Sequence, residues 1–263
     1  MSAIALEARG LVKSFGGLRA VDDVTFAVDE GSLVALIGPN GAGKSTLFNI
    51  LTRLFAPDAG SVHFFGADLS AQRSDAIAAR GLIRTFQTAR SFPDMTVLEN
   101  VLVGAHVRVR GGPWQQALNL GTVAREERLL RERAREMLAL IGLEPAANES
   151  ATSLALGSQK LLEIARALMS NPRVLLLDEP AAGLNDAETD ELAALLLAVR
   201  ATGITLLVVE HNMSLVMGIA DEVLVLDAGR MIACGTPRQI QANERVIEAY
   251  VGRGASALVE AAP

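Results

Sequence analysis

Short runs of β-branched residues and leucine recur along the chain and alternate with stretches of helical periodicity. Four of these runs are almost continuously apolar, as expected of strands that are covered on both faces. They are Leu33–Ile37, Val174–Leu177, Thr205–Val209 and Val223–Leu226. Helical patterns such as Ser45–Leu54 and Asp186–Arg200 lie between them. The alternation predicts an α/β domain around a mainly parallel central sheet.

Residues 1–30 and 60–66 follow a different pattern, in which apolar and polar positions alternate more clearly. Such alternation is typical of strands with one buried face. The runs Val24–Val28 and Ser61–Phe65 are the strands expected there. We therefore expect a smaller antiparallel layer in addition to the central sheet.

Residues 88–170 have a mostly helical pattern. Glu127 and Arg131 stand four residues apart, a spacing at which opposite charges stabilise a helix. Apolar residues also recur at helical spacing. They are Leu130, Ala134, Met137 and Ile141. We predict a helical subdomain over this stretch.

The helical stretch carries an excess of positive charge. From Arg108 to Arg135 there are seven arginines against three glutamates, a net charge of +4 within an acidic protein. A solvated helix face and a docking or lipid-headgroup surface are the two interpretations of this charge. We expect one domain over residues 4–252, with the helical stretch as its subdomain, and a disordered tail at residues 253–263.

The composition narrows the class of protein. Of the 263 residues, 50% are apolar and 21% are charged, which supplies a sizeable core and excludes a disordered chain. The formal charge, 24 − 30 = −6, argues against a nucleic-acid-binding protein that works through overall positive charge. The single cysteine excludes an internal disulfide framework and fits a reducing compartment.

The sequence shows no targeting or membrane-spanning segment. The N-terminus lacks a basic segment followed by an apolar one, and the apolar runs are far shorter than the ~20 residues of a membrane span. We therefore expect a soluble, cytoplasmic protein. Any connection to a membrane would come through a partner.

The most specific motif in the chain is GPNGAGKS, which matches the phosphate-binding pattern GxxxxGK[ST]. Glycines let successive backbone N–H groups turn inward around phosphate oxygens, and the helix N-terminus adds a partial positive charge. Lys44, one of only three lysines, would reach the terminal phosphates, and the Ser45 hydroxyl would coordinate Mg²⁺. An ordinary glycine-rich turn is the alternative. The motif residues are Gly38, Pro39, Asn40, Gly41, Ala42, Gly43, Lys44 and Ser45.

A second motif distinguishes hydrolysis from other uses of a phosphate loop. The apolar run Val174–Leu177 ends in the acid pair Asp178 and Glu179. Asp178 is placed to hold Mg²⁺ through water, and Glu179 to polarise the attacking water. Without the phosphate loop, such a pair would be read as a solvated strand end or a helix cap.

With these motifs in order, the chain resembles the ATP-binding subunit of an ABC transporter from Leu6 to about Gly252. The resemblance implies the corresponding P-loop NTPase fold: a mainly parallel central sheet, an antiparallel β layer and a helical subdomain. ATP and Mg²⁺ are the implied cofactors.

The resemblance also implies roles for side chains outside the two motifs. Phe15 stands where the family places an aromatic ring that stacks on adenine, although it could equally be a core residue. Gln87 matches the glutamine that binds Mg²⁺ or water and senses the membrane subunit. His211 matches the switch histidine that contacts the γ-phosphate, and Thr46 extends the nucleotide-binding loop. The implied sets are Glu179, His211 and Gln87 for catalysis, and Ser45, Gln87 and Asp178 for the metal.

Several stretches are similar to importer ATPases that serve branched-chain amino acids. Asn185 occupies the position where most ABC ATPases carry the D-loop aspartate, a replacement that this subfamily shares. The similar stretches are GLIRTFQ (81–87), MTVLEN (95–100), EPAAGLN (179–185), EHNMSLVMGIA (210–220), GTP (235–237) and VIEAYV (246–251).

The family's LSGGQ signature is only partly matched. Counting back from the helix at residues 164–168 aligns its first leucine with Leu154, and only that leucine and Gly157 agree with the pattern. Ala155 removes a hydroxyl that would donate to the γ-phosphate, although backbone N–H groups and a helix N-terminus remain. The aligned residues are Leu154, Ala155, Gly157 and Ser158, followed by Gln159.

The resemblance implies two ATPase subunits that close on ATP, each phosphate loop facing the partner's signature. It implies two transmembrane permease subunits, an external solute-binding protein, and a second ATPase that is either homologous or identical. The chain would sit at the cytoplasmic side of the cell membrane as a peripheral subunit, with no nucleic-acid partner.

The function expected from the resemblance is ATP-driven import of branched-chain amino acids or a related small solute. The sequence leaves urea, amides and aromatic acids open as solutes. A soluble ABC ATPase of DNA repair, translation or cluster assembly is the alternative, and an exporter ATPase is a third reading. The soluble class would be marked by a second ATPase half, a long coiled-coil insertion or basic tails, and this sequence has none of them.

Overall fold

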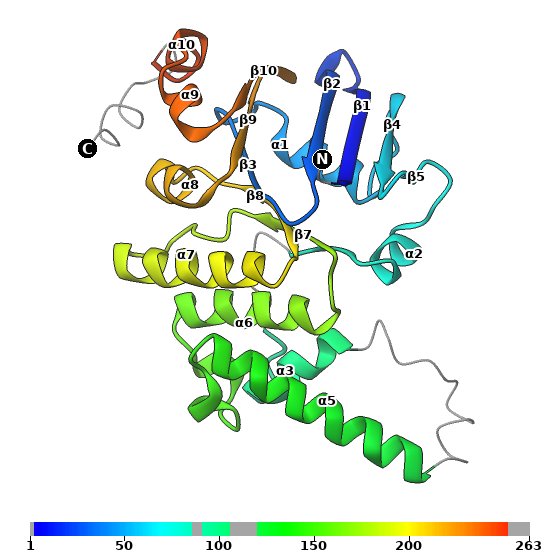
Figure 1. Ribbon diagram of the computed structural model, residues 1–263, viewed down its shortest axis with the longest axis vertical. Helices are drawn as coiled ribbons and strands as arrows, with labels where there is room; N and C mark the ends of the chain where they lie inside the picture. Colours follow the sequence, from blue (N-terminus) through cyan, green and yellow to red (C-terminus); the bar gives the residue numbers. More distant parts are fainter. Residues whose placement is uncertain (1–2, 86–90, 106–119, 252–263) are drawn as a thin grey trace. The chain divides into compact units, whose positions relative to one another are not determined.

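The computed structural model describes residues 3–85, 91–105 and 120–251 (Figure 1). The chain divides into two compact units. The first comprises Met1–Gln87 and Arg173–Pro263, and the second comprises Thr88–Pro172. The tail predicted at residues 253–263 lies outside the described residues.

The central sheet of the first unit has six strands in the order β10-β9-β3-β8-β7-β6. Neighbouring strands are parallel except for the pair β9 and β10, which confirms the predicted mainly parallel sheet. Every residue of β3, β7 and β8 is buried, as their continuous apolar runs require. The strands are β3 (Leu33–Ile37), β6 (Leu82–Arg84), β7 (Val174–Asp178), β8 (Thr205–Val209), β9 (Glu222–Asp227) and β10 (Arg230–Gly235).

A second sheet in this unit has the order β2-β1-β4-β5, and all its pairs are antiparallel. It confirms the predicted antiparallel layer. Buried and exposed positions alternate along the second half of β2 because one face of this sheet packs on the core. The strands are β1 (Ile4–Phe15), β2 (Leu18–Asp29), β4 (Ala59–Phe64) and β5 (Ala67–Asp68).

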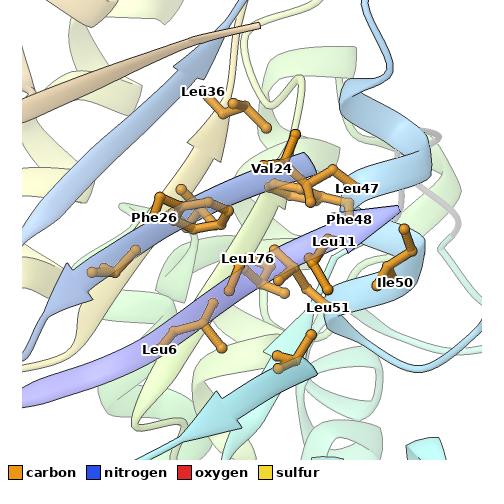
Figure 2. Packing of buried hydrophobic residues seen from close by; sticks show 14 of the residues in the cluster. Leu6, Leu11, Val24, Phe26, Leu36, Leu47, Phe48, Ile50, Leu51 and Leu176 are labelled. Atoms are coloured by element: carbon orange, nitrogen blue, oxygen red, sulfur yellow. The ribbon is translucent and has the colours of Figure 1, made fainter. Parts of the chain in front are cut away.

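An apolar cluster of the first unit anchors helix α1 (Lys44–Leu51) between the strands of both sheets (Figure 2). Leu47, Phe48 and Leu51 of the helix are fully buried in the same cluster as Leu11 of β1 and Leu176 of β7. Burial of each of these side chains contributes roughly 1.5–3 kcal/mol. The start of α1, and with it the phosphate loop, is therefore fixed by the core.

The helix predicted over Ser45–Leu54 ends three residues earlier, at Leu51. The Thr52 hydroxyl donates to the Phe48 carbonyl, and Arg53 adopts a left-handed conformation with φ 59°. A left-handed residue cannot continue an α-helix. Local backbone geometry thus overrides the apolar pattern that continues to Leu54.

The other helices of the first unit begin with different capping residues. Asn185, Asn212 and Thr236 cap α7, α8 and α9 with their side chains, whereas α2 has no side-chain cap. The helices are α2 (Ser74–Ala79), α7 (Asp186–Ala201), α8 (Met213–Ile219), α9 (Pro237–Gln241) and α10 (Glu244–Val251).

The second unit is helical, as predicted. Ala134 and Leu138 are fully buried positions on its long helix, and the predicted Glu127–Arg131 pair is present at 2.8 Å. Helices α3, α5 and α6 pack on one another in this unit. The elements are α3 (Val97–Val103), α5 (Leu120–Leu140), α6 (Leu156–Met169) and the 3₁₀ turns η2 (Glu144–Ala146) and η3 (Ala151–Ser153). Among the described helices, none is both long enough and apolar enough to span a bilayer.

The described arginines of α5 are exposed or half-buried, and three of them have partners within the same unit. Arg131 pairs with Glu127, and Arg133 donates to the side chain of Asn171 at 3.0 Å. Arg135 lies 3.8 Å from Glu144. These contacts fit the solvated-face interpretation of the arginine-rich stretch. Arg108 and Arg110 lie outside the described residues.

Candidate active site

The phosphate loop joins the end of β3 to the start of α1, as its motif predicts. Gly38 and Gly43 have φ of 153° and 103°, values that L side chains rarely adopt. A Cβ atom at Gly38 would clash with the carbonyl oxygen of Leu226, and one at Gly43 with that of Ala20. Glycine is therefore required at both ends of the loop for steric reasons. Gly41 also has a positive φ, of 80°, but nothing lies within 4 Å of its Cβ position.

Lys44 lies beneath this loop and is only 6% exposed. Its Nζ donates to the carbonyl oxygens of Gly38 and Pro39 at 2.7 and 3.0 Å. Burial lowers the pKa of Lys44, while the carboxylates of Glu179 and Asp178 act in the opposite direction. Carbonyl oxygens of the phosphate loop thus hold the Lys44 ammonium in position.

Asp178 is the last residue of β7 and is 4% exposed. Its Oδ2 accepts a charge-assisted hydrogen bond of 2.7 Å from Nη2 of Arg84, which ends β6. Arg84 Nη1 donates to the side-chain oxygen of Asn49 on α1 at 2.6 Å. Because both members of the pair are largely buried, Arg84 balances a charge that would otherwise be costly. Sequence reasoning did not assign Arg84 a role.

Glu179 follows Asp178 in a left-handed conformation with φ 51°. Its Oε1 lies 2.7 Å from Nε2 of His211, which follows β8. The structure therefore brings together two of the three residues that the motif order assigns to catalysis. The His211 side chain is 41% exposed and the Glu179 side chain 19%.

A cavity of about 530 Å³ lies over the phosphate loop. Phe15 at the end of β1 forms part of its wall and is 45% exposed, which argues against the core alternative for this ring. The Phe55 ring meets it edge-on, with centroids 5.6 Å apart. The lining comprises Phe15, Leu18, Arg19, Ala20, Asn40, Gly41, Ala42, Gly43, Lys44, Ser45, Thr46, Glu179, His211 and Ala228.

The signature-like residues lie in the second unit. Ala155 is the N-cap of α6, and it makes no side-chain capping bond. The Nε2 atom of Gln159 donates to the Leu154 carbonyl at 2.8 Å. Gly157 is buried and Ser158 is half-buried in the first turn of the helix. This segment is ordered by its own local hydrogen bonds.

Two further predicted residues have different outcomes. Asn185 caps α7: its Oδ1 accepts from the Glu188 N–H, and Glu188 Oε2 accepts from the Asn185 N–H, both at 3.0 Å. This is a capping box, a role that its sequence position alone did not suggest. Gln87 lies outside the described residues.

Sequence reasoning also gave no role to Glu210, which is 3% exposed and lies between β8 and His211. Its carboxylate accepts hydrogen bonds from three backbone N–H groups. An acid at the end of an almost continuously apolar strand was the available signal, the same signal that marked Asp178.

The phosphate loop follows β3, the acid pair stands at the end of β7, and the histidine follows β8, which lies between β3 and β7 in the sheet. This arrangement defines a P-loop nucleoside triphosphatase. Residues 21–182 match the ABC transporter family, and residues 230–256 match the family described as branched-chain amino acid ATP-binding cassette transporter. The chain therefore belongs to the ABC transporter family, as an ATP-binding subunit that resembles the branched-chain amino acid group.

Curated relatives support this assignment along the whole chain. The high-affinity branched-chain amino acid transport ATP-binding protein BraF of Pseudomonas aeruginosa is 44% identical over 253 residues, which cover 96% of this chain and 99% of the relative. LivG of Escherichia coli, which carries the same description, has the same identity and coverage. These relatives give no support to the non-transport alternative.

Solved structures agree with the fold. The ADP conformation of MJ1267, an ATP-binding cassette of an ABC transporter, matches with a TM-score of 0.83 at 33% identity, covering 95% of this chain and 99% of that one. CbiO1 from Clostridium perfringens, part of the ABC transporter complex cbiONQ, matches with a TM-score of 0.80 at 26% identity, covering 96% of each chain. The expected fold class and the ATPase class are both confirmed.

Proposed function

We propose that this chain binds MgATP in the cavity over the phosphate loop and hydrolyses it to drive the import of branched-chain amino acids or a related small solute. The observation that carries the hydrolytic assignment is the 2.7 Å contact between Glu179 and His211 in the same cavity as the buried Lys44. A carboxylate can orient the attacking water, and an imidazole and an ammonium can stabilise the charge that develops on the phosphate.

Nucleotide binding rests on the loop from Gly38 to Thr46. Its backbone N–H groups and the start of α1 would face the phosphates. Lys44 Nζ would exchange its two carbonyl partners for phosphate oxygens, which are stronger acceptors because they are charged. Phe15 would stack on the adenine, since its ring lies in the cavity wall with a large exposed fraction.

The donor set fits Mg²⁺. This ion favours oxygen ligands and is usually held by one or two carboxylates together with substrate phosphates and water. Ser45 offers a hydroxyl at the start of α1, and Asp178 offers a carboxylate at the end of β7. When bound, Mg²⁺ neutralises charge on the phosphates. Arg84 holds the Asp178 carboxylate in a fixed orientation, and Gln87 is the further ligand implied by the family pattern.

The chemical step is assigned to Glu179 and His211. The Glu179 carboxylate would orient and polarise the attacking water, and His211 would hold that carboxylate and contact the γ-phosphate. Their separation of 2.7 Å supports a shared task.

The functional form is proposed to be an ATPase pair bound to two transmembrane permease subunits, at the cytoplasmic face of the membrane, with an external solute-binding protein. Leu154, Ala155, Gly157, Ser158 and Gln159 would serve the partner's nucleotide, with Asn185 near the subunit contact. Two solved structures of one related cassette, MJ0796, a bacterial ABC transporter cassette, are described as dimeric, which supports pairing.

Branched-chain amino acids are the favoured solutes because BraF and LivG are described as serving their transport. The test is ATP hydrolysis by the chain reconstituted with the permease subunits and solute-binding protein that co-purify with it. Leucine, isoleucine or valine should stimulate hydrolysis. Stimulation by urea or aromatic acids alone would contradict the proposed solute but leave the ATPase assignment in place.

The catalytic assignment is tested separately with Glu179→Gln. We expect a fall in turnover of about 100-fold or more, since the variant loses the group that activates water. ATP affinity should stay close to that of the wild type, because Glu179 acts on water and not on the phosphates. Near wild-type turnover would contradict the assignment.

A further inference from the structure

Glu210 connects two loops of the candidate active site through its buried carboxylate. Its Oε1 accepts a hydrogen bond of 2.6 Å from the Ala181 N–H. Its Oε2 accepts from the N–H groups of His211 and Asn212 at 3.0 and 3.3 Å. A buried carboxylate is costly unless such donors satisfy it, so these bonds determine where Glu210 lies.

The same two loops are also linked by a side-chain contact and by a backbone hydrogen bond. Ala181 is two residues beyond Glu179, whose Oε1 lies 2.7 Å from His211 Nε2. The Glu179 N–H also donates to the Val209 carbonyl at 2.9 Å, directly before Glu210. The two loops are therefore linked by the Glu210–Ala181 bond, the Glu179–His211 contact and the Glu179–Val209 backbone bond.

Glu210 itself is not arranged to touch nucleotide. Each of its oxygens already accepts a backbone hydrogen bond, and among the described residues it is not part of the cavity lining. Its contribution to the reaction must then pass through the residues on either side of it.

We propose that Glu210 is a positioning residue for ATP hydrolysis, which ties the Glu179 loop to the His211 loop and so sets the separation of their reacting groups. This inference rests on the proposed roles of Glu179 and His211. A displacement of about 1 Å in a catalytic group can cost about 100-fold in rate. A single buried carboxylate that fixes both loops is therefore well placed to affect the chemical step.

Two conservative variants of Glu210 separate its hydrogen bond to Ala181 from its hydrogen bonds to His211 and Asn212. Glu210→Gln keeps the volume but replaces one acceptor oxygen by an NH₂ group, so it loses the bonds at one end. Glu210→Asp keeps the charge but is one methylene shorter, so it should retain the nearby His211 and Asn212 donors and release Ala181. Asp221→Asn is the matched control, because its Oδ2 accepts the Leu33 N–H at 2.8 Å at the opposite end of β3.

The experiment measures ATP affinity, kcat and KM of the full chain and its variants. Both Glu210 variants should lower kcat by about 10- to 100-fold with KM nearly unchanged, the pattern of a group that acts in the chemical step. Asp221→Asn should keep the wild-type kcat. Parallel losses of ATP affinity, kcat and melting temperature would indicate a merely structural role and overturn the inference.

A double-variant cycle with His211→Ala adds a readout that general destabilisation would not reproduce. If Glu210 acts through the Glu179–His211 pair, Glu210→Gln should cost much less in kcat when His211 is already alanine. An equal loss in both backgrounds would overturn the inference.

The outcomes separate this inference from the proposed function. If Glu179→Gln and His211→Ala keep wild-type turnover, the proposed catalytic roles fail. If those variants lower turnover while either Glu210 variant has the wild-type kcat, only the positioning role of Glu210 fails.

Discussion

Helices α1 and α6 begin alike but are preceded by very different segments. Neither has a side-chain cap, since α1 follows Gly43 and α6 follows Ala155, whereas α3, α7, α8 and α9 are all capped by threonine or asparagine. An uncapped first turn leaves backbone N–H groups for another partner, such as an anion. These two helices carry the phosphate loop and the signature-like segment.

The two helices differ in how strictly the residue types that precede them are constrained. Before α1, glycines at 38 and 43 are the only residues that fit, and Lys44 is buried against the loop carbonyls. Before α6, the order comes from the Gln159 bond to Leu154, and alanine occupies the capping position. Steric contacts thus require glycine at both ends of the phosphate loop, whereas the segment before α6 is ordered by local hydrogen bonds.

The largest expected effect comes from removing the Lys44 ammonium at the start of α1. Lys44→Ala should weaken ATP binding by about 10- to 150-fold, because a charged hydrogen bond to phosphate is worth about 1.5–3 kcal/mol and the ammonium is buried. Isothermal titration with ATP measures this loss. Arg131→Ala is the control, since the exposed Arg131 pairs with Glu127 on α5 and should change affinity little. Unchanged affinity in Lys44→Ala would remove the phosphate-site assignment.

A smaller effect tests whether steric contacts require glycine in the phosphate loop. Gly43→Ala introduces a clash with the Ala20 carbonyl, whereas Gly41→Ala meets no atom within 4 Å, although both residues have positive φ. Overpacking costs about 1–3 kcal/mol beyond the shared backbone strain. Urea unfolding should therefore show Gly43→Ala to be less stable than Gly41→Ala by that amount. Equal stabilities would mean that the loop adapts, and the contrast with α6 would weaken.

The smallest effect lies at α6. Ala155→Ser supplies the missing cap and should raise the free energy of unfolding by about 0.5–2 kcal/mol. Urea unfolding checks this value. Ala139→Ser, at an exposed position inside α5, should not stabilise because serine is a poorer helix former than alanine there. If both substitutions act alike, Ala155 is not a capping position.

The sequence predicted the parts of the site that local patterns encode. The apolar runs identified β3, β7 and β8, and the motifs identified Lys44, Asp178 and Glu179 because each directly follows a loop or strand of recognisable type. His211 needed the family's motif order, since an isolated histidine carries no such pattern.

Long-range partners could not be predicted in the same way. Arg84 meets Asp178 across 94 positions of sequence, and Glu210 meets Ala181 across 29. Both contacts depend on the order of strands in the sheet, which no local periodicity specifies. The three-residue strand β6 was missed for a related reason, because it is too short to show alternation.

The left-handed backbone at Glu179 has a consequence for how this protein would respond to selection. A non-glycine residue at φ 51° costs about 1–2 kcal/mol relative to an unstrained conformation. Glycine or asparagine would relieve that cost, so a screen that rewarded only resistance to heat would favour replacing the carboxylate that we propose to orient the attacking water. With that role for Glu179, stability and turnover are opposed at this position, and a heat-adapted homologue that kept its activity would have to gain its stability elsewhere.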